Sequence, residues 1–219
     1  MTKIKNFFKS ITNSKKKVFA LALSVCVVVL SIASSSIAYF TDTAKYTNTF
    51  TSGKVDITLT VNGEVIDTSK AYNDEDVYPG QEIDKLTSIN NKADSKSAFI
   101  GAIITVQAPE NFLDDTSVKA LFKGISDTDR TITVKKTTAS GVDTFSIYVV
   151  YTNAVAADNS VQVFSDIVIP SEWNTTEMSK FTSVSFDVIG YAVQVDGFAD
   201  ATTALKTAFT GAFNNMPTP

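Results

Sequence analysis

Histidine is absent from the 219-residue sequence, and cysteine occurs once, as Cys26. Without histidine the chain has no Ser-His-Asp triad, no HExxH zinc site and no imidazole general base. Cys26 lies in an N-terminal apolar stretch that is expected to be removed on export, so the exported chain would lack thiols and disulfides and would be stabilised by packing alone. The sequence also lacks a GxGxxG motif and a P-loop, which leaves carboxylates as its main candidates for chemistry.

The N-terminus has the order of a secretory signal. A basic region with six lysines and no acid precedes the apolar run 18–32, and a serine-rich segment follows. Signal peptidase requires small residues three and one positions before the cut, and Ser36 and Ala38 supply them. Cleavage is therefore predicted after Ala38, with Tyr39 as the first mature residue. The alternative is an uncleaved anchor, because the uncharged window 18–41 is long enough to span a bilayer.

The mature chain is expected to be acidic. Removing 38 residues leaves 219 − 38 = 181, and it removes six of the 19 Lys+Arg but none of the 23 Asp+Glu, so the net charge becomes 13 − 23 = −10. Nucleic-acid binding depends on cationic contacts to phosphates and is therefore not expected. The sequence closes on GAFNNMPTP without an LPxTG-like motif, which predicts release from the membrane rather than attachment to the cell wall. Membrane contact is expected only through the signal peptide before cleavage.

Most of the mature sequence has the period of β-strands. Apolar residues alternate with polar ones from Val55 to Val61, and Asn62-Gly63 then predicts a type I′ hairpin turn. A second hairpin is predicted around Ser140-Gly141, and the segment 97–106 is apolar on both faces, which is typical of a central strand. The prediction is an all-β protein, an antiparallel jelly-roll-like β-sandwich with one or two short helices. Its parts would be a cleaved signal peptide (1–38), an N-terminal arm (39–52) and a single β-sandwich domain (53–219).

Two helices are predicted from side-chain periodicity. The first begins with Asp115 as its N-cap and ends at Gly124. The second places Ala201, Leu205, Phe209 and Phe213 in one stripe near the C-terminus. In the preceding segment 182–195 the apolar residues stand first at even-numbered and later at odd-numbered positions. We interpret this change as a β-bulge near Gly190.

Acidic clusters are the remaining candidates for a site. Asp74, Glu75 and Asp76 are a weak calcium candidate, since clustered oxygens in a loop can hold this ion. The pairs Asp114-Asp115 and Asp127/Asp129 could in principle act as acid and base, but solvated turn residues are the usual explanation for such pairs in the loops of an acidic protein. No catalytic residue, no metal site beyond this candidate and no cofactor is predicted. Trp173 is expected to cover an edge of the sandwich from a loop.

The junction between signal and first strand resembles the TasA/camelysin family of Gram-positive bacteria. The similar motifs are AYFTD (38–42), NTF (48–50), GKVDITL (53–59) and VYPGQEI (77–83), followed by INNKADSKSAFIGAIITV (89–106) and SFDVIGYAVQVDGF (185–198). The resemblance extends over nearly the whole mature chain and is strongest in its first thirty or so residues. It implies secretion through the dedicated signal peptidase SipW, a jelly-roll sandwich and assembly into extracellular fibres of the biofilm matrix. Camelysin members also carry a metalloprotease label, for which this sequence offers no histidine ligand.

In fibres of the TasA type, the mature N-terminal segment leaves its own subunit and completes the sheet of the next one. The residues of this chain favour the same behaviour, because 39–51 combines threonines with aromatics and has little charge. The predicted donor strand has Phe40, Asp42, Ala44, Tyr46 and Phe50 on one face, with Tyr39 at its start. Its expected partner is a second copy or a homologous matrix protein. The alternative is that these residues form an ordinary first strand of their own subunit, and a secreted camelysin-type protease or a monomeric surface-binding module remains open as the function.

Overall fold

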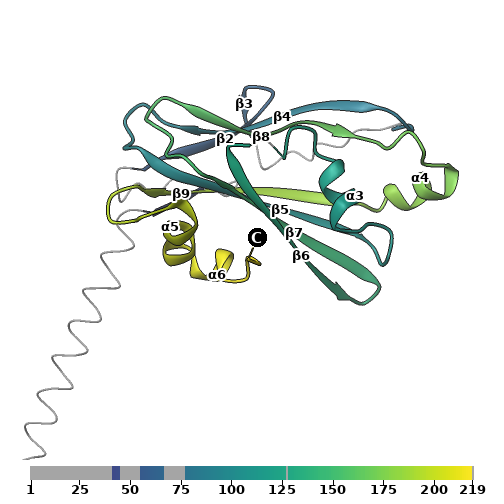
Figure 1. Cartoon of the computed structure of the whole chain (residues 1–219). Helices are drawn as coiled ribbons and strands as arrows, with labels where there is room; N and C mark the ends of the chain where they lie inside the picture. Colours follow the sequence, from purple (N-terminus) through teal and green to yellow (C-terminus); the bar gives the residue numbers. More distant parts are fainter. Residues whose placement is uncertain (1–40, 45–54, 67–76, 127, 219) are drawn as a thin grey trace, which may run out of the picture. The chain divides into compact units, whose positions relative to one another are not determined.

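The computed structural model describes residues 41–44, 55–66, 77–126 and 128–218, and all of them belong to one compact unit, Phe40–Pro219. The described strands form two antiparallel sheets. The five-stranded sheet, called sheet A here, has the order β1-β9-β5-β7-β6, and the four-stranded sheet B has the order β3-β2-β4-β8 (Figure 1). Their bounds are β1 Thr41–Ala44, β2 Ile57–Val61, β3 Glu64–Val65, β4 Glu82–Asn91, β5 Ala98–Pro109, β6 Arg130–Ala139, β7 Val142–Tyr151, β8 Ser160–Val168 and β9 Ser185–Gln194. The predicted all-β antiparallel sandwich is confirmed.

The central strand β5 explains how the molecule is layered. One side of it, including Ile100 and Ile104, is buried between the two sheets with Ile57, Ile89 and Phe145. Its other side, including Phe99 and Ile103, is buried under C-terminal helices. This arrangement confirms the prediction of a central strand that is apolar on both faces, because each face has its own hydrophobic partner.

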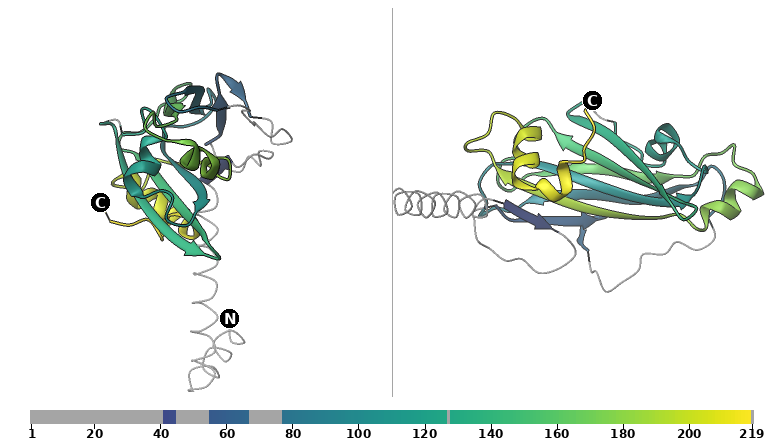
Figure 2. Two further views of the ribbon diagram at one scale, coloured as in Figure 1. Left: turned by 90° about the vertical axis from the view of Figure 1, so that its right-hand side faces the viewer. Right: turned by 90° about the horizontal axis from the view of Figure 1, so that it is seen from below.

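Two helices cover one half of the outer face of sheet A. They are α5 (Ala201–Ala208) and α6 (Thr210–Phe213), and Figure 2 shows them from below. Leu205 and Phe213 are completely buried against the sheet. The predicted amphipathic helix is thus present, but it breaks at Phe209, where φ is −122° and ψ is 58°.

Local turn chemistry fixes both predicted hairpins. Asn62 and Gly63 have φ angles of 51° and 81°, and Ser140 and Gly141 have φ angles of 53° and 77°. Two successive positive φ angles match the right-handed twist of antiparallel strands, and Asn-Gly or a similar pair adopts them at low cost. The Asn62-Gly63 turn joins β2 to β3, and the Ser140-Gly141 turn joins β6 to β7.

The other two described helices show what local sequence signals predict and miss. The helix α3 spans Asp115–Ala120, and its N-cap is Asp114 rather than the predicted Asp115. Asp114 accepts hydrogen bonds from the N–H groups of Thr116 and Ser117 at 3.0 and 2.7 Å. A further helix, α4 (Thr175–Phe181), was not predicted. None of the described helices has both the length and the apolar character that crossing a membrane demands.

The predicted bulge near Gly190 is wrong. Strand β9 pairs with β5 in an unbroken register from Ser185↔Gln107 to Gln194↔Ala98. The apolar phase changes because both faces of β9 are buried towards its end. Val188 and Ala192 belong to the core between the sheets, whereas Tyr191 and Val193 lie under the C-terminal helices.

Candidate functional site

The N-terminal edge of sheet A contains the described part of the predicted donor strand. Strand β1 pairs antiparallel with β9 in the register Thr41↔Val193, Asp42↔Ala192, Thr43↔Tyr191 and Ala44↔Gly190. Its described residues, Thr41–Ala44, form the outermost strand of the sheet, as the right-hand view of Figure 2 shows in purple. In the single chain, this part of the predicted donor segment therefore pairs within its own subunit.

The sheets approach each other closely at this edge. A Cβ atom added to Gly190 would lie 3.1 Å from Cδ1 of Ile89 and 3.6 Å from Cδ1 of Ile57. Gly190 is the residue that faces Ala44 across the ladder. Because Gly190 has no side chain, Ile57 and Ile89 of sheet B can pack closely against β9. This contact lies at the residue of β9 that pairs with Ala44 of β1.

The predicted site residues fall into two groups. Asp42 and Ala44 lie in β1, next to β9. The other predicted donor residues, Tyr39, Phe40, Tyr46 and Phe50, lie outside the described residues, as do the cleavage-site residues Ser36 and Ala38 and the calcium candidate Asp74, Glu75 and Asp76.

The remaining acidic residues from the sequence analysis have local roles. Hydrogen bonds from Ser117, first from its backbone N–H, hold the pKa of Asp114 below its ordinary value. Asp129 forms an ion pair with Arg130 at 2.8 Å. Asp127 is not among the described residues.

No metal centre is found in the part of the chain that the structure describes, where no group of three or more His, Cys, Asp or Glu side chains could hold an ion. The whole sequence, moreover, contains no histidine. The donor set therefore does not fit the nitrogen-rich environment of a catalytic zinc, for which three protein ligands, usually including histidine, are needed.

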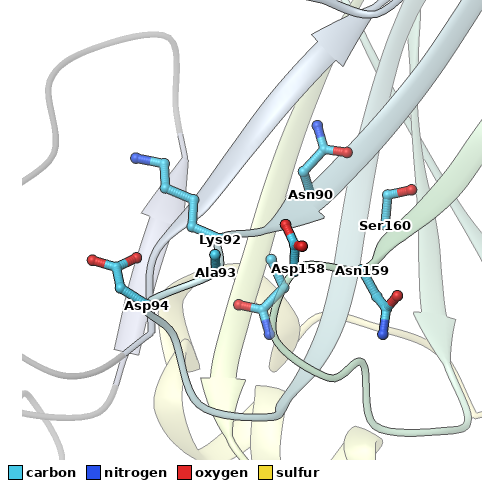
Figure 3. Close-up of a pocket in the computed structure, with 8 residues that line it drawn as sticks. Asn90, Lys92, Ala93, Asp94, Asp158, Asn159 and Ser160 are labelled. Carbon is cyan, nitrogen blue, oxygen red and sulfur yellow. The ribbon is translucent and has the colours of Figure 1, made fainter.

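A polar hollow of about 560 Å³ lies where β4 ends and β8 begins (Figure 3). Its lining includes the carboxylates of Asp94 and Asp158 together with Lys92 and Asn159. Figure 3 shows the side chains of Asp94 and Asp158 well apart from each other. Two separated carboxylates beside a lysine do not form a calcium cage, which requires six to eight converging oxygens.

Trp173 contacts two aromatic rings close to the C-terminal end of β5. Its ring centroid lies 5.2 Å from that of Phe112 and 5.3 Å from that of Phe181. All three pack against the margin of the core between the sheets. Trp173 therefore covers an edge of the sandwich from a loop, as expected. The helix α4 that follows it was not predicted. The sequence signal was present, because Asn174 and Glu177 form a capping box.

Taken together, these features define a histidine-free β-sandwich whose first described strand is a short edge strand. The chain belongs to the camelysin metallo-endopeptidase family, whose family model matches residues 13–144, more than half of the 219 residues. No curated protein and no solved structure matches the chain significantly.

Proposed function

We propose that this chain is a secreted structural protein that assembles into extracellular matrix fibres by donating its mature N-terminal strand to the next subunit. The observation that carries the proposal is the position of β1, whose described residues Thr41–Ala44 lie at the edge of sheet A. An edge strand pairs on one side only, so it can exchange between subunits without opening the centre of the sheet.

The chain between β1 and sheet B provides the necessary reach. Ten residues, 45–54, separate β1 from Val55, the next described residue. Ten residues can span at most about 33–36 Å when extended, which is comparable to the length of a small domain. Donation from each subunit to the next is heterologous and does not close on itself, so it produces a filament.

Export supports the same proposal. A basic region, an apolar run and a small-residue site are the parts of a secretory signal, and cleavage after Ala38 by a SipW-type signal peptidase would free Tyr39 as the start of the arm. The proposed location is the extracellular matrix or surface of a Gram-positive bacterium. The proposed partners are further copies of this chain or a homologous matrix protein, without nucleic acid.

The competing function is proteolysis, because the family is described as a metallo-endopeptidase. Against it stand the lack of histidine in the sequence and the lack of a metal-holding group among the described residues. We therefore favour a non-enzymatic role. A monomeric surface-binding module is the third candidate, and the β1 edge does not favour it.

Deletion of residues 39–50 from the mature chain separates these functions. A fibre protein should remain folded by circular dichroism but form no filaments in electron micrographs, whereas a protease should retain chelator-sensitive peptide cleavage. The control is a chain shortened at the other end by residues 217–219, which are distant in sequence from β1. Filaments of normal appearance from the chain without 39–50 would contradict strand donation.

A further inference from the structure

Asn91, the last residue of β4, has a side-chain amide that is only half paired. Its Nδ2 group donates hydrogen bonds to the carbonyl oxygens of Lys96 at 2.9 Å and Val155 at 3.0 Å. These acceptors fix the orientation of the amide, because the reverse orientation would place Oδ1 against two carbonyl oxygens. Asn91 is only 1% exposed, and no described residue donates a hydrogen bond to its Oδ1. A buried acceptor without a partner costs free energy, so it needs an explanation.

Asn91 lines the polar hollow between the end of β4 and the start of β8. Residues 92–94 of the following turn line the same hollow, and Ala93 and Asp94 in this turn are exposed. An unpaired carbonyl oxygen of an amide accepts hydrogen bonds only. A ligand that satisfies Oδ1 of Asn91 must therefore carry N–H or O–H groups.

The charge of the hollow opposes anionic ligands. Lys92 extends away from Asp158 in Figure 3. The ammonium of Lys92 forms an ion pair with Asp56 at 2.8 Å, which neutralises its charge. The remaining charged residues of the lining, Asp94 and Asp158, are both anionic and exposed. A phosphate, a sulfate or a uronic acid would be repelled by these two carboxylates.

The lining suits hydroxyl groups better than ammonium or guanidinium groups. Such cations only donate hydrogen bonds, whereas a hydroxyl group both donates and accepts them. Besides its carboxylates, the hollow contains the hydroxyl of Ser160 and the side-chain amide of Asn159, which also do both. The hollow therefore matches a neutral ligand that carries several hydroxyl groups.

A second hollow adjoins the first, and Asn159 lines both of them. The lining of the second hollow includes Ala154, Val155 and Val161, so it offers an apolar surface beside the polar one. The two volumes, about 560 and 300 Å³, lie within the range of about 300–1,000 Å³ that is typical of small-molecule sites. A chain of sugar rings combines hydroxyl groups with C–H surfaces and so matches both hollows.

We propose that the two hollows bind a neutral oligosaccharide. Asn91 and Asp158 accept hydrogen bonds from its hydroxyl groups, and Asn159 contacts it in both hollows. The exposed turn 92–95 shifts slightly to admit one hydroxyl group to Oδ1 of Asn91, which thereby gains the donor that no described residue supplies. Strand β1 contributes no residue to the lining, so this site is independent of strand donation.

Calorimetric titration of the mature chain with N-acetylchitopentaose, cellopentaose and maltopentaose tests the proposal. At least one of these neutral oligosaccharides should bind at millimolar concentration, and the one that binds distinguishes N-acetylhexosamine units from hexose units. Trigalacturonate, which is anionic, should bind more weakly. The proposal is overturned if none of the three neutral oligosaccharides binds, or if trigalacturonate binds equally well or more tightly.

The side-chain amide of Asn91 reports whether the ligand reaches Oδ1. Its Nδ2 signal in a ¹H–¹⁵N NMR spectrum should shift as the bound oligosaccharide is added, because a hydroxyl group that donates to Oδ1 polarises the amide. An oligosaccharide that binds without moving this signal occupies another site, and the assignment to this hollow would then be wrong.

A matched pair of variants provides the third test. Asn159→Ala removes the amide that both hollows share, and Asn215→Ala removes an exposed amide near the C-terminus. Asn159→Ala should weaken oligosaccharide binding roughly tenfold, whereas Asn215→Ala should bind like the unaltered chain. Equal binding by the two variants would refute the site. Both variants should form filaments equally well, so a failure of this site is distinguishable from a failure of the fibre function.

Discussion

Lys136 Nζ lies 2.7 Å from Oδ2 of Asp143, whose side chain is fully buried beside the turn between β6 and β7. The same carboxylate accepts hydrogen bonds from the hydroxyl of Thr138 at 2.6 Å and from the backbone N–H of Asn111 at 2.8 Å. Asn111 has a φ of 58°, so the loop after β5 turns sharply at the point where Asp143 holds it. One buried carboxylate therefore joins the hairpin to the neighbouring loop.

The replacement Asp143→Asn should make the free energy of unfolding less dependent on pH between pH 7 and acidic conditions. The hydrogen bond from Lys136, followed by that from Thr138, lowers the pKa of Asp143 in the folded chain. A lowered folded-state pKa stabilises the protein above the ordinary aspartate pKa of about 3.9, and this stabilisation is lost as the pH falls through the folded-state value. At pH 7 the variant should therefore unfold at a lower urea concentration than the unaltered chain. The difference should shrink below about pH 4.

Asp94→Asn is the matched control, because the side chain of Asp94 is exposed to solvent. Its urea midpoint should follow that of the unaltered chain at every pH. A constant difference between Asp143→Asn and the unaltered chain from pH 7 to pH 3 would show that the charge of Asp143 does not contribute to stability.

Gly101 should not tolerate a side chain. A Cβ atom at this position would lie 2.7 Å from Cδ1 of Leu205 and 3.1 Å from Cζ of Phe213, the two residues that anchor the C-terminal helices. Overpacking of this kind costs about 1–3 kcal/mol. We expect Gly101→Ala to lower the free energy of unfolding by that amount and to accelerate hydrogen exchange in α5. Gly211→Ala is the control: nothing lies within 4 Å of its added Cβ and Gly211 is part of α6, where alanine is favoured over glycine, so this variant should not lose stability.

Local sequence signals predicted the individual strands and turns of this fold better than they predicted which elements pack against one another. The Asn62-Gly63 and Ser140-Gly141 turns are encoded by adjacent residues, so both hairpins could be found from the sequence. The apolar phase of β9 was misread as a bulge, because the helices that bury Tyr191 and Val193 come later in the chain. Which faces of a strand are buried depends on tertiary contacts, and periodicity alone does not reveal them.

The candidate site was less accessible to sequence reasoning than the fold. The strand character of β1 was predicted from its threonines, but its partner, β9, lies about 150 residues away and follows only from the order of the sheet. Local composition contains no information on pairing between segments so far apart in the sequence.

Calcium should not stabilise the protein measurably. Asp74, Glu75 and Asp76 are consecutive, whereas a calcium loop of the EF-hand type takes side-chain oxygens from alternate positions and adds a bidentate glutamate to reach six to eight ligands. Binding to the folded state would be easy to detect, because ligand at 100 times its Kd adds about 2.7 kcal/mol. We expect no change in Tm when millimolar calcium replaces a chelator. A rise that is abolished by Asp74→Asn with Asp76→Asn would establish a site.

Replacing Asn174 should loosen the α4 end of the sandwich without unfolding the core. The side chain of Asn174 accepts a hydrogen bond from the N–H of Thr176 at 2.7 Å, and Glu177 accepts one in return from the N–H of Asn174 at 3.0 Å. Loss of an N-cap costs about 0.5–2 kcal/mol, and α4 has no buried residue to compensate for it. Asn174→Ala should therefore release Trp173 from Phe112 and Phe181. Since Trp173 is the only tryptophan, its fluorescence should shift to longer wavelength well below the global unfolding transition.

Asn215→Ala, at an exposed position near the C-terminus, should leave the spectrum unchanged. A single transition shared by fluorescence and circular dichroism in Asn174→Ala would show instead that α4 unfolds only with the core.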